Sequence, residues 1–266
     1  DMVCEKNADC THDFDLDPID LYIENGILKA RGTTLGADDG MGCAYMLALL
    51  KENDADIVRC AFQNRFRTRT EQWLAGEDRC VMEGKTFLVR FTTDWTCGLL
   101  WNKLYKRALF DGIFFEEGHK IDDEYFTYQG VMNAAKVVCD PRVVYNYRQR
   151  ASSVMQSPAA RAQIAVDRID FMAKRREKVL KRFPELRREF DISFVDALSY
   201  LAKYPDNTEQ SIRLLKYYAR RYFLQRGNTF PPRYLLKAVF LMYATGTEKL
   251  LKRSQAKKPS PEDYYA

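Results

Sequence analysis

The sequence predicts an α/β fold, in which a mixed sheet is followed by a mainly helical C-terminal region. Runs rich in β-branched and aromatic residues at 55–62, 136–140 and 142–148 are typical of strands. Beyond Pro158 the pattern changes, because apolar residues recur at helical spacing. Such a change from strands to consecutive helices separates a sheet-bearing part from a helical extension.

The N-terminal part predicts a hairpin and a helix. Two apolar runs within 21–32 flank Asn25-Gly26, a pair that strongly favours a two-residue hairpin turn. A glycine-punctuated loop follows at 33–42. Residues 41–52 then have the spacing of an amphipathic helix.

The middle of the chain gives a less regular pattern. We expect residues 63–80, which are polar and rich in Arg, to form a loop with one short helix. Residues 87–93 fit either a strand or the first turn of a helix. Residues 97–110 and 121–136 are expected to be helical, the second starting near three acidic residues.

The C-terminal part predicts four helices and a tail. The helices are expected at 159–183, 191–203 and 207–225, with a last one running from Pro231-Pro232 through Leu251. The polar, proline-containing tail at 254–266 is expected to be disordered.

Charge is unevenly spread along the 266 residues, which carry a formal net charge of +5. Residues 1–50 hold ten acidic and three basic side chains, a net charge of −7, which leaves +12 for residues 51–266. A basic body favours a nucleotide-sugar diphosphate, an anionic membrane face or a nucleic acid as partner. Solvated helix faces explain the same charge at least as well, and no nucleic-acid-binding motif is found.

The seven cysteines show neither a CxxC pair nor zinc-ribbon spacing. An odd count argues against a disulfide framework, so we expect reduced thiols and a cytoplasmic protein. The longest apolar runs are far shorter than the roughly 20 residues of a membrane span, and no signal peptide is visible.

The most informative motifs form an ordered series. They are WNKLYKR at 101–107, FFEEG at 114–118, IDDEYFTY at 121–128 and YNYRQRASS at 145–153. The third contains the acidic residues Asp122, Asp123 and Glu124, which either supply a general base or complement a helix dipole. Trp101 could stack on a sugar ring, although a core position is the commoner role of such a residue.

From about Lys51 onward, this series resembles family 2 glycosyltransferases, which build bacterial surface polysaccharides. The resemblance implies a partial sheet of the GT-A type and transfer of a sugar from a nucleotide-sugar donor to a surface-glycan or lipid-linked acceptor. It also implies that Asp123, preceded by Asp122, is the catalytic base, that Arg148 and Arg150 lie near the donor, and that Mg²⁺ or Mn²⁺ assists. The strand and base pocket that open the family's donor-binding half have no counterpart here, so we expect the acceptor half.

Residues 1–50 resemble a different family, the di-zinc aminoacyl-histidine dipeptidases. Gly36-Ala37-Asp38-Asp39-Gly40 matches the loop that carries this family's bridging carboxylate, and Asp38 takes the bridging position. Under this alternative the metal is zinc, held by Asp38 and Asp39 among others. The adjacent glutamates and the later ligands of the family are missing, and zinc needs three or four ligands. Under the transferase hypothesis, we expect the same two aspartates to contact Mg²⁺ or Mn²⁺.

We therefore expect a dipeptidase-like fragment at 1–50, a transferase-like acceptor half at 51–158, a helical extension at 159–253 and the tail at 254–266. Three functions stay open: a glycosyltransferase, a fragment of a zinc dipeptidase, and a hybrid without catalysis. Clusters such as 174–176 and 181–182 are basic, so the helical extension could contact the inner face of the membrane peripherally. A helical bundle with a solvated basic face is the favoured alternative.

Overall fold

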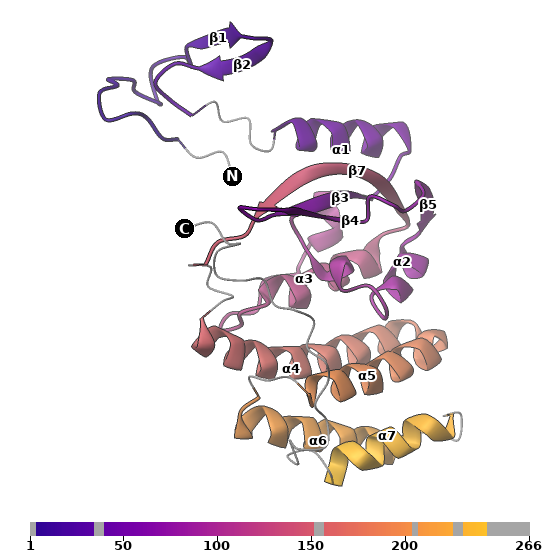
Figure 1. Ribbon diagram of the computed structural model, residues 1–266. Coiled ribbons are helices and arrows are strands. Elements are labelled where there is room, and N and C mark those ends of the chain that lie inside the picture. Colours follow the sequence, from indigo (N-terminus) through magenta and orange to yellow (C-terminus); the bar gives the residue numbers. More distant parts are fainter. Residues whose placement is uncertain (1–3, 35–39, 152–156, 204–206, 226–230, 244–266) are drawn as a thin grey trace.

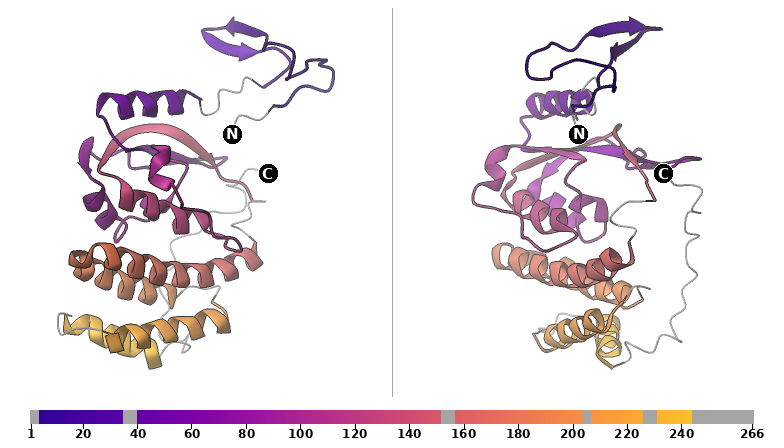
Figure 2. Two further views of the ribbon diagram at one scale, coloured as in Figure 1. Left: turned by 180° about the vertical axis from the view of Figure 1, so that it is seen from behind. Right: turned by 90° about the vertical axis from the view of Figure 1, so that its left-hand side faces the viewer.

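The computed structural model describes residues 4–34, 40–151, 157–203, 207–225 and 231–243. Its elements lie in layers, with a small hairpin, a helix, a mixed sheet, a layer of helices and then the C-terminal helices in succession (Figure 1). Figure 2 shows the same succession from behind and from the side. The prediction of an α/β fold with a helical C-terminal region is confirmed.

The main sheet is mixed, and β3 (Ile57–Arg65) and β7 (Lys136–Arg148) are its parallel central pair. Strand β5 (Cys80–Glu83) pairs antiparallel with the outer edge of β7. Two short strands, β4 (Thr70–Trp73) and β6 (Lys103–Tyr105), share the other edge of β3. The strands predicted at 55–62 and 136–148 are therefore the two that build the centre of the sheet.

Strand β7 is one long strand where the sequence showed two runs. The register against β3 shifts at Ala61, because Pro141 and Arg142 have no counterpart between the pairs Cys60–Asp140 and Ala61–Val143. Proline has no backbone N–H to donate to a ladder, so a bulge at this position is expected.

Helices cover both faces of the sheet. Helix α1 (Gly40–Glu52) packs Met46 and Leu49 against Val58 and Val138 on one face. Helices α2 (Gly84–Arg90) and α3 (Asp122–Asn133) cover the other face, where the larger core lies. Alternate residues of β3 and β7 therefore enter two different cores, as expected for strands buried on both faces.

The C-terminal helices form the layers beyond α2 and α3. They are α4 (Pro158–Arg182), α5 (Arg187–Leu201), α6 (Glu209–Gln225) and α7 (Pro232–Tyr243). Helix α4 begins with Ser157 as N-cap, whose Oγ accepts from the N–H of Ala160 at 3.2 Å. The helices α5, α6 and α7 share a second core with one side of α4.

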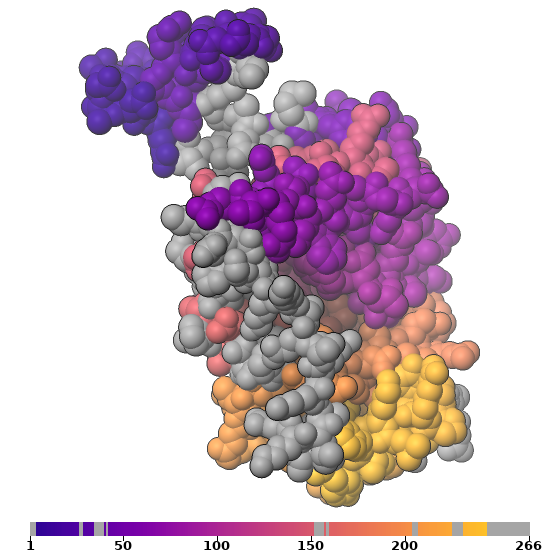
Figure 3. Space-filling view, viewed as in Figure 1, coloured from indigo at the N-terminus to yellow at the C-terminus, as the bar shows by residue number. Residues whose placement is uncertain are grey.

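The N-terminal hairpin stands apart from these layers, as the indigo segment at the top of Figure 3 shows. It consists of β1 (Leu21–Glu24) and β2 (Ile27–Ala30), joined by Asn25 and Gly26 with φ of 52° and 76°. The predicted hairpin and the predicted turn residues are therefore confirmed. An isolated two-stranded sheet is of marginal stability by itself.

Two expectations for the middle of the chain are wrong. Residues 63–80 are not a loop with one short helix, since β3 extends to Arg65 and β4 follows, with Trp73 stacked on Phe62. Residues 97–110 are not a helix, because β6 pairs with β3 and is flanked by the short 3₁₀ turns η1 (Trp95–Gly98) and η2 (Arg107–Phe110). Strands of three or four residues are too short to show a periodicity, and pairing with β3 decides their conformation.

Several other expectations can be compared with the described residues. Residues 87–93, left undecided, belong mainly to α2, and the helices expected at 41–52 and 121–136 are present. The last helix is described as far as Tyr243, while 244–251 and the tail at 254–266 lie outside the described residues. No described helix is long and apolar enough to cross a membrane.

The basic side chains at 174–176 contact other residues of the protein or are buried in it. Lys174 Nζ lies 2.8 Å from a Glu116 carboxylate oxygen and 3.1 Å from one of Asp170. Arg176 Nε donates to Asp191 Oδ1 at 2.7 Å, and Arg175 is buried. These three side chains therefore stabilise the contact of α4 with its neighbours, as a helical bundle requires.

Candidate functional site

The acidic triplet Asp122-Asp123-Glu124 opens α3, the helix that leads into β7. Residues 134–135 join the two elements, so α3 runs back along β7 and its N-terminus lies toward the carboxyl ends of β3 and β7 (Figure 1). In open α/β sheets, ligands bind at this end of the strands. The predicted base therefore lies where such a fold offers a site.

Asp123 is the member of the triplet with the environment of a base. Burial raises the pKa of its carboxyl above the ordinary value, and the nearby charge of Asp122 raises it further. The backbone N–H of Glu124, which donates to Asp123 Oδ1 at 2.9 Å, and the ammonium of Lys103 oppose this rise. A carboxylate whose pKa is raised toward neutrality accepts a proton more readily, as general base catalysis needs.

Glu124 connects α3 to the 3₁₀ turn η1. A Cβ atom added at Gly98 would lie only 3.2 Å from Glu124 Cγ, so the turn and the helix are in close contact. Burial raises the pKa of Glu124, while the positive charges of Arg168 and Arg175 oppose the rise. The position of the triplet thus depends on the position of η1.

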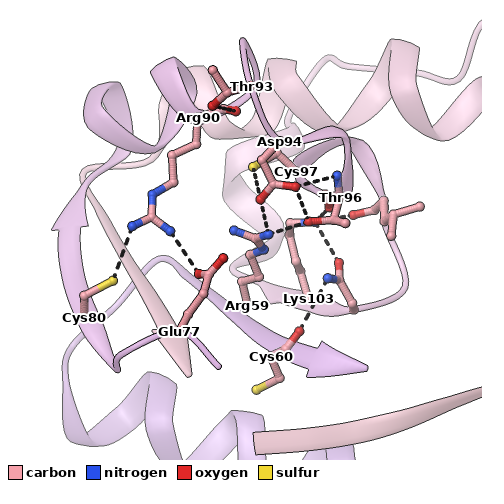
Figure 4. Close-up of polar contacts among 12 residues, drawn as sticks. Arg59, Cys60, Glu77, Cys80, Arg90, Thr93, Asp94, Thr96, Cys97 and Lys103 are labelled. Carbon is pink, nitrogen blue, oxygen red and sulfur yellow. Dashed lines mark hydrogen bonds and ion pairs between the residues drawn. The ribbon is translucent and has the colours of Figure 1, made fainter. Parts of the chain in front are cut away.

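A buried ion pair fixes η1 (Figure 4). The guanidinium of Arg59, which is 1% exposed, donates to the carboxylate of Asp94 and to Thr96 Oγ1. Asp94 also accepts from the N–H of Thr96 at 2.9 Å and from its hydroxyl at 2.6 Å. Burial alone would raise the pKa of Asp94, but the charge of Arg59 and the bonds from Thr96 hold it below its ordinary value.

Lys103 adds a second buried cation to this network. Its ammonium donates to the carbonyl oxygen of Thr96 at 3.1 Å, to Asn102 Oδ1 at 2.7 Å and to the carbonyl oxygen of Leu99. Burial lowers the pKa of Lys103 to about 7. The adjacent thiol of Cys97 has its pKa raised by burial to about 12, so it stays protonated and unreactive at neutral pH.

Only part of this network has a sequence signal. The spacing Asp94-x-Thr96 is a sequence signal for the cap that opens η1. Arg59 and Lys103 gave no such signal, because arginine and lysine are rarely buried and their sequence neighbours do not show which carboxylate or carbonyl they meet.

The predicted donor-binding arginines lie at and just beyond the carboxyl end of β7. Arg148 is the last residue of β7 and the register partner of Arg65, the last residue of β3. Both Arg148 and Arg150 are exposed. Their location is compatible with contact to an anionic ligand, and their role stays a prediction.

The predicted metal ligands Asp38 and Asp39 lie outside the described residues. Within the described ranges, no group of three or more His, Cys, Asp or Glu side chains could hold a metal ion. The expectations of Mg²⁺ or Mn²⁺, and of zinc under the dipeptidase alternative, are therefore untested.

Comparison with known proteins finds two partial similarities. The chain is 29% identical over 117 residues, 41% of its length, to "Glycosyltransferase GlyG" of Streptococcus pneumoniae serotype 4 (strain ATCC BAA-334 / TIGR4). It is 56% identical over 54 residues, 20% of its length, to "Cytosol non-specific dipeptidase" of Escherichia coli (strain K12). The matches span 39% of the first relative and 11% of the second, and no protein-family model matches the chain.

Proposed function

We propose that this protein is a glycosyltransferase of the family 2 type, which transfers a sugar from a nucleotide-sugar donor to a surface-glycan or lipid-linked acceptor. The observation that carries this proposal is the half-buried Asp123 in the first turn of α3, whose pKa is raised by burial and by the charge of Asp122. The distant similarity to a glycosyltransferase supports it. The contact between η1 and α3 supplies the rigid support that a catalytic carboxylate needs.

In the proposed reaction, Asp123 takes the proton of an acceptor hydroxyl. The acceptor oxygen forms a bond to the anomeric carbon of the donor sugar as the bond from this carbon to the diphosphate breaks, and the bonding electrons leave with the nucleoside diphosphate. Burial and the neighbouring charge of Asp122 raise the pKa of Asp123. This assignment uses a single carboxylate as base, as an inverting transfer requires.

The departing diphosphate needs positive charge around it. Arg148 and Arg150 are the proposed source, since both are exposed at and just beyond the carboxyl end of β7. A divalent cation would neutralise the same charge. The described residues offer no ligand group for one, so no step is assigned to a cation.

The test compares two neighbouring carboxylates. Asp123→Asn removes the base while keeping the shape of the side chain, and the rate of nucleoside diphosphate release in the presence of acceptor should fall by about 10²–10⁴-fold. Asp122→Asn is the matched control: it should retain turnover, and the acidic limb of its pH–rate profile should move to lower pH. Equal loss in both variants, or full activity of Asp123→Asn, would contradict the assignment.

The short, 56% identical match supports a second candidate, a zinc-binding remnant of a dipeptidase. This candidate predicts stoichiometric zinc in the purified chain, lost in Asp38→Ala. Zinc analysis by mass spectrometry checks it, with His119→Ala, outside the dipeptidase-like segment, as the control. A chain purified without zinc that also fails to take it up would exclude this candidate.

A further inference from the structure

All three tryptophans of the chain belong to one connected row of aromatic rings. Trp95 lies in η1, Trp73 in β4 and Trp101 just before β6. Tyrosines of β7 extend the row. Tryptophans of three different elements therefore converge on one edge of the sheet.

The ring contacts are continuous from one end of the row to the other. Trp95 meets Trp73 edge to face, with ring centroids 5.3 Å apart, and Trp73 stacks on Phe62 at 6.3 Å. Phe62 meets Trp101 edge to face at 4.7 Å. Trp101 then lies nearly parallel to Tyr147, with centroids 5.0 Å apart and planes 24° apart. Since Trp73, Phe62 and Tyr147 lie on three neighbouring strands, the row spans about 10 Å across the sheet.

The two ends of the row are exposed and its centre is buried. Trp95 is 57% exposed and Tyr147 is 36% exposed, whereas Phe62 is fully buried. Core packing explains Phe62, but it does not explain large rings placed in water at both ends of a rigid stack. Exposed aromatic surface of this kind marks a binding site more often than a structural need.

The polar side chains beside the row include carboxamides and one ion pair, between Arg69 and Glu71, the register partner of Asn64 in β4. Asn64 is the register partner of Tyr147, and its Oδ1 accepts from Gln149 Nε2 at 3.3 Å. Ligand sites typically combine aromatic surface with a few placed polar groups. Flat rings beside carboxamides suit a ligand that has apolar C–H faces and many hydroxyl groups, which is the chemistry of a sugar.

The row is also connected to the proposed base. Trp95 is the first residue of η1, and Gly98, the last residue of this turn, contacts Glu124 next to Asp123. The Arg59–Asp94 pair that fixes η1 therefore fixes one end of the row and the start of α3 together.

We propose that this aromatic row is the surface on which the sugar rings of the acceptor glycan lie, so that the acceptor is an oligosaccharide or polysaccharide chain with more than one sugar in contact with the protein. This inference rests on the proposed function, because only a transferase has an acceptor. The binding of sugar rings to the row does not itself depend on catalysis. Trp95 and Tyr147 supply the accessible stacking faces at the two ends. Trp101 and Trp73 hold these faces in place.

The experiment measures glycan binding without a donor and without turnover. Neutral oligosaccharides of two to six glucose or N-acetylglucosamine units are titrated against the whole chain, with excitation at 295 nm. Because the three tryptophans all lie in the row, their fluorescence reports on this site alone. We expect a saturable change whose affinity increases with chain length up to a few sugars.

Calorimetry on variants then locates the binding. Trp95→Ala and Tyr147→Ala should each weaken binding by about tenfold, since each removes one stacking face, and Trp95→Phe should retain most of it. Tyr243→Ala in α7, which removes an 81% exposed ring far from the row in sequence, is the matched control and should bind as the wild type does. Because Trp95 is more than half exposed, its loss should leave the melting temperature unchanged.

Three results would overturn the inference: no saturable change with any of these oligosaccharides, equal affinity of Trp95→Ala and wild type, or a larger response to nucleoside monophosphates than to sugars. The last would make the row a base-stacking surface of the donor. Glycan binding by a chain that shows no sugar transfer would contradict the proposed function while leaving the binding surface intact. Sugar transfer that is unaffected by Trp95→Ala and Tyr147→Ala would contradict the proposed binding surface while leaving the proposed function intact.

Discussion

The N-terminal hairpin and the sheet-bearing body, which comprises the elements from α1 to α7, contain similar ion pairs in different environments. In the hairpin segment, Arg31 Nε lies 3.1 Å from Asp20 Oδ2, with the two side chains 66% and 64% exposed. In the body, the Arg59–Asp94 pair has side chains 1% and 24% exposed and joins β3 to η1. Exposed pairs are worth at most about 1 kcal/mol, whereas the loss of one partner of a buried pair leaves a charge without compensation.

Resemblance to a family and integration into a fold are separate properties in this molecule. The hairpin stands apart from the two cores of the sheet, whereas α1, at the end of the same dipeptidase-like segment, packs Met46 and Leu49 against the sheet (Figure 1). The body has a core on each face and a buried polar network beside the proposed base. We therefore expect stability and function to depend on the body.

Asp94→Ala should destabilise the protein by about 3–5 kcal/mol, because Arg59 is left buried without its counter-charge. The matched variant Asp20→Ala, which breaks the exposed pair of the hairpin, should cost less than about 1 kcal/mol. Urea unfolding followed by circular dichroism measures both. Similar midpoints for the two variants would remove the distinction between the regions.

Gly84→Ala should cost about 1–3 kcal/mol through overpacking. Its Cβ would lie 2.0 Å from the backbone oxygen of Ala134, in the segment that joins α3 to β7, and backbone cannot rotate away as a side chain can. Gly76→Ala is the control, since a Cβ there meets nothing within 4 Å. Thermal unfolding should separate the two, and an unchanged melting temperature for Gly84→Ala would show that α2 is packed less tightly than described.

Lys103 should make stability depend on pH. Its pKa is lowered from 10.5 to about 7 in the folded protein, so the unfolded chain binds more protons between these values and stability rises with pH across this window. The slope contributed is at most about 1.4 kcal/mol per pH unit. Lys103→Met should lack this contribution.

The measurement for Lys103 is urea unfolding at pH 7 and pH 9.5 for wild type and Lys103→Met. The wild type should gain stability relative to the variant as the pH rises. Parallel pH profiles would mean that the ammonium is charged in the folded protein throughout this range. The groups that face it, Asp94, Arg59 and Cys97, are unchanged in the variant.

Sequence patterns predicted the regular parts of this fold and missed the parts decided by contacts between distant residues. Asn25-Gly26 predicted the hairpin, and the β-branched runs predicted β3 and β7, because these signals are local. Strands β4 and β6 were missed, since their pairing with β3 outweighs their weak local pattern. Asp123 was predicted from a motif, and its role stays a prediction, whereas Arg59, Lys103 and the three-tryptophan row were not predicted. Arg59 and Asp94 are 35 positions apart in the sequence, and Trp101 and Tyr147 are 46 apart, so only the fold brings these partners together.

The most direct test of the account is a calorimetric titration of the folded chain with uridine and guanosine diphosphate sugars, in the presence of Mg²⁺ or Mn²⁺. We expect saturable binding of at least one donor, weakened in Arg148→Ala and Arg150→Ala and unchanged in Asp20→Ala. A chain that unfolds cooperatively, and so is folded at the start, yet binds none of these donors would contradict it. The similarity to a glycosyltransferase would then describe the origin of the body and not its activity.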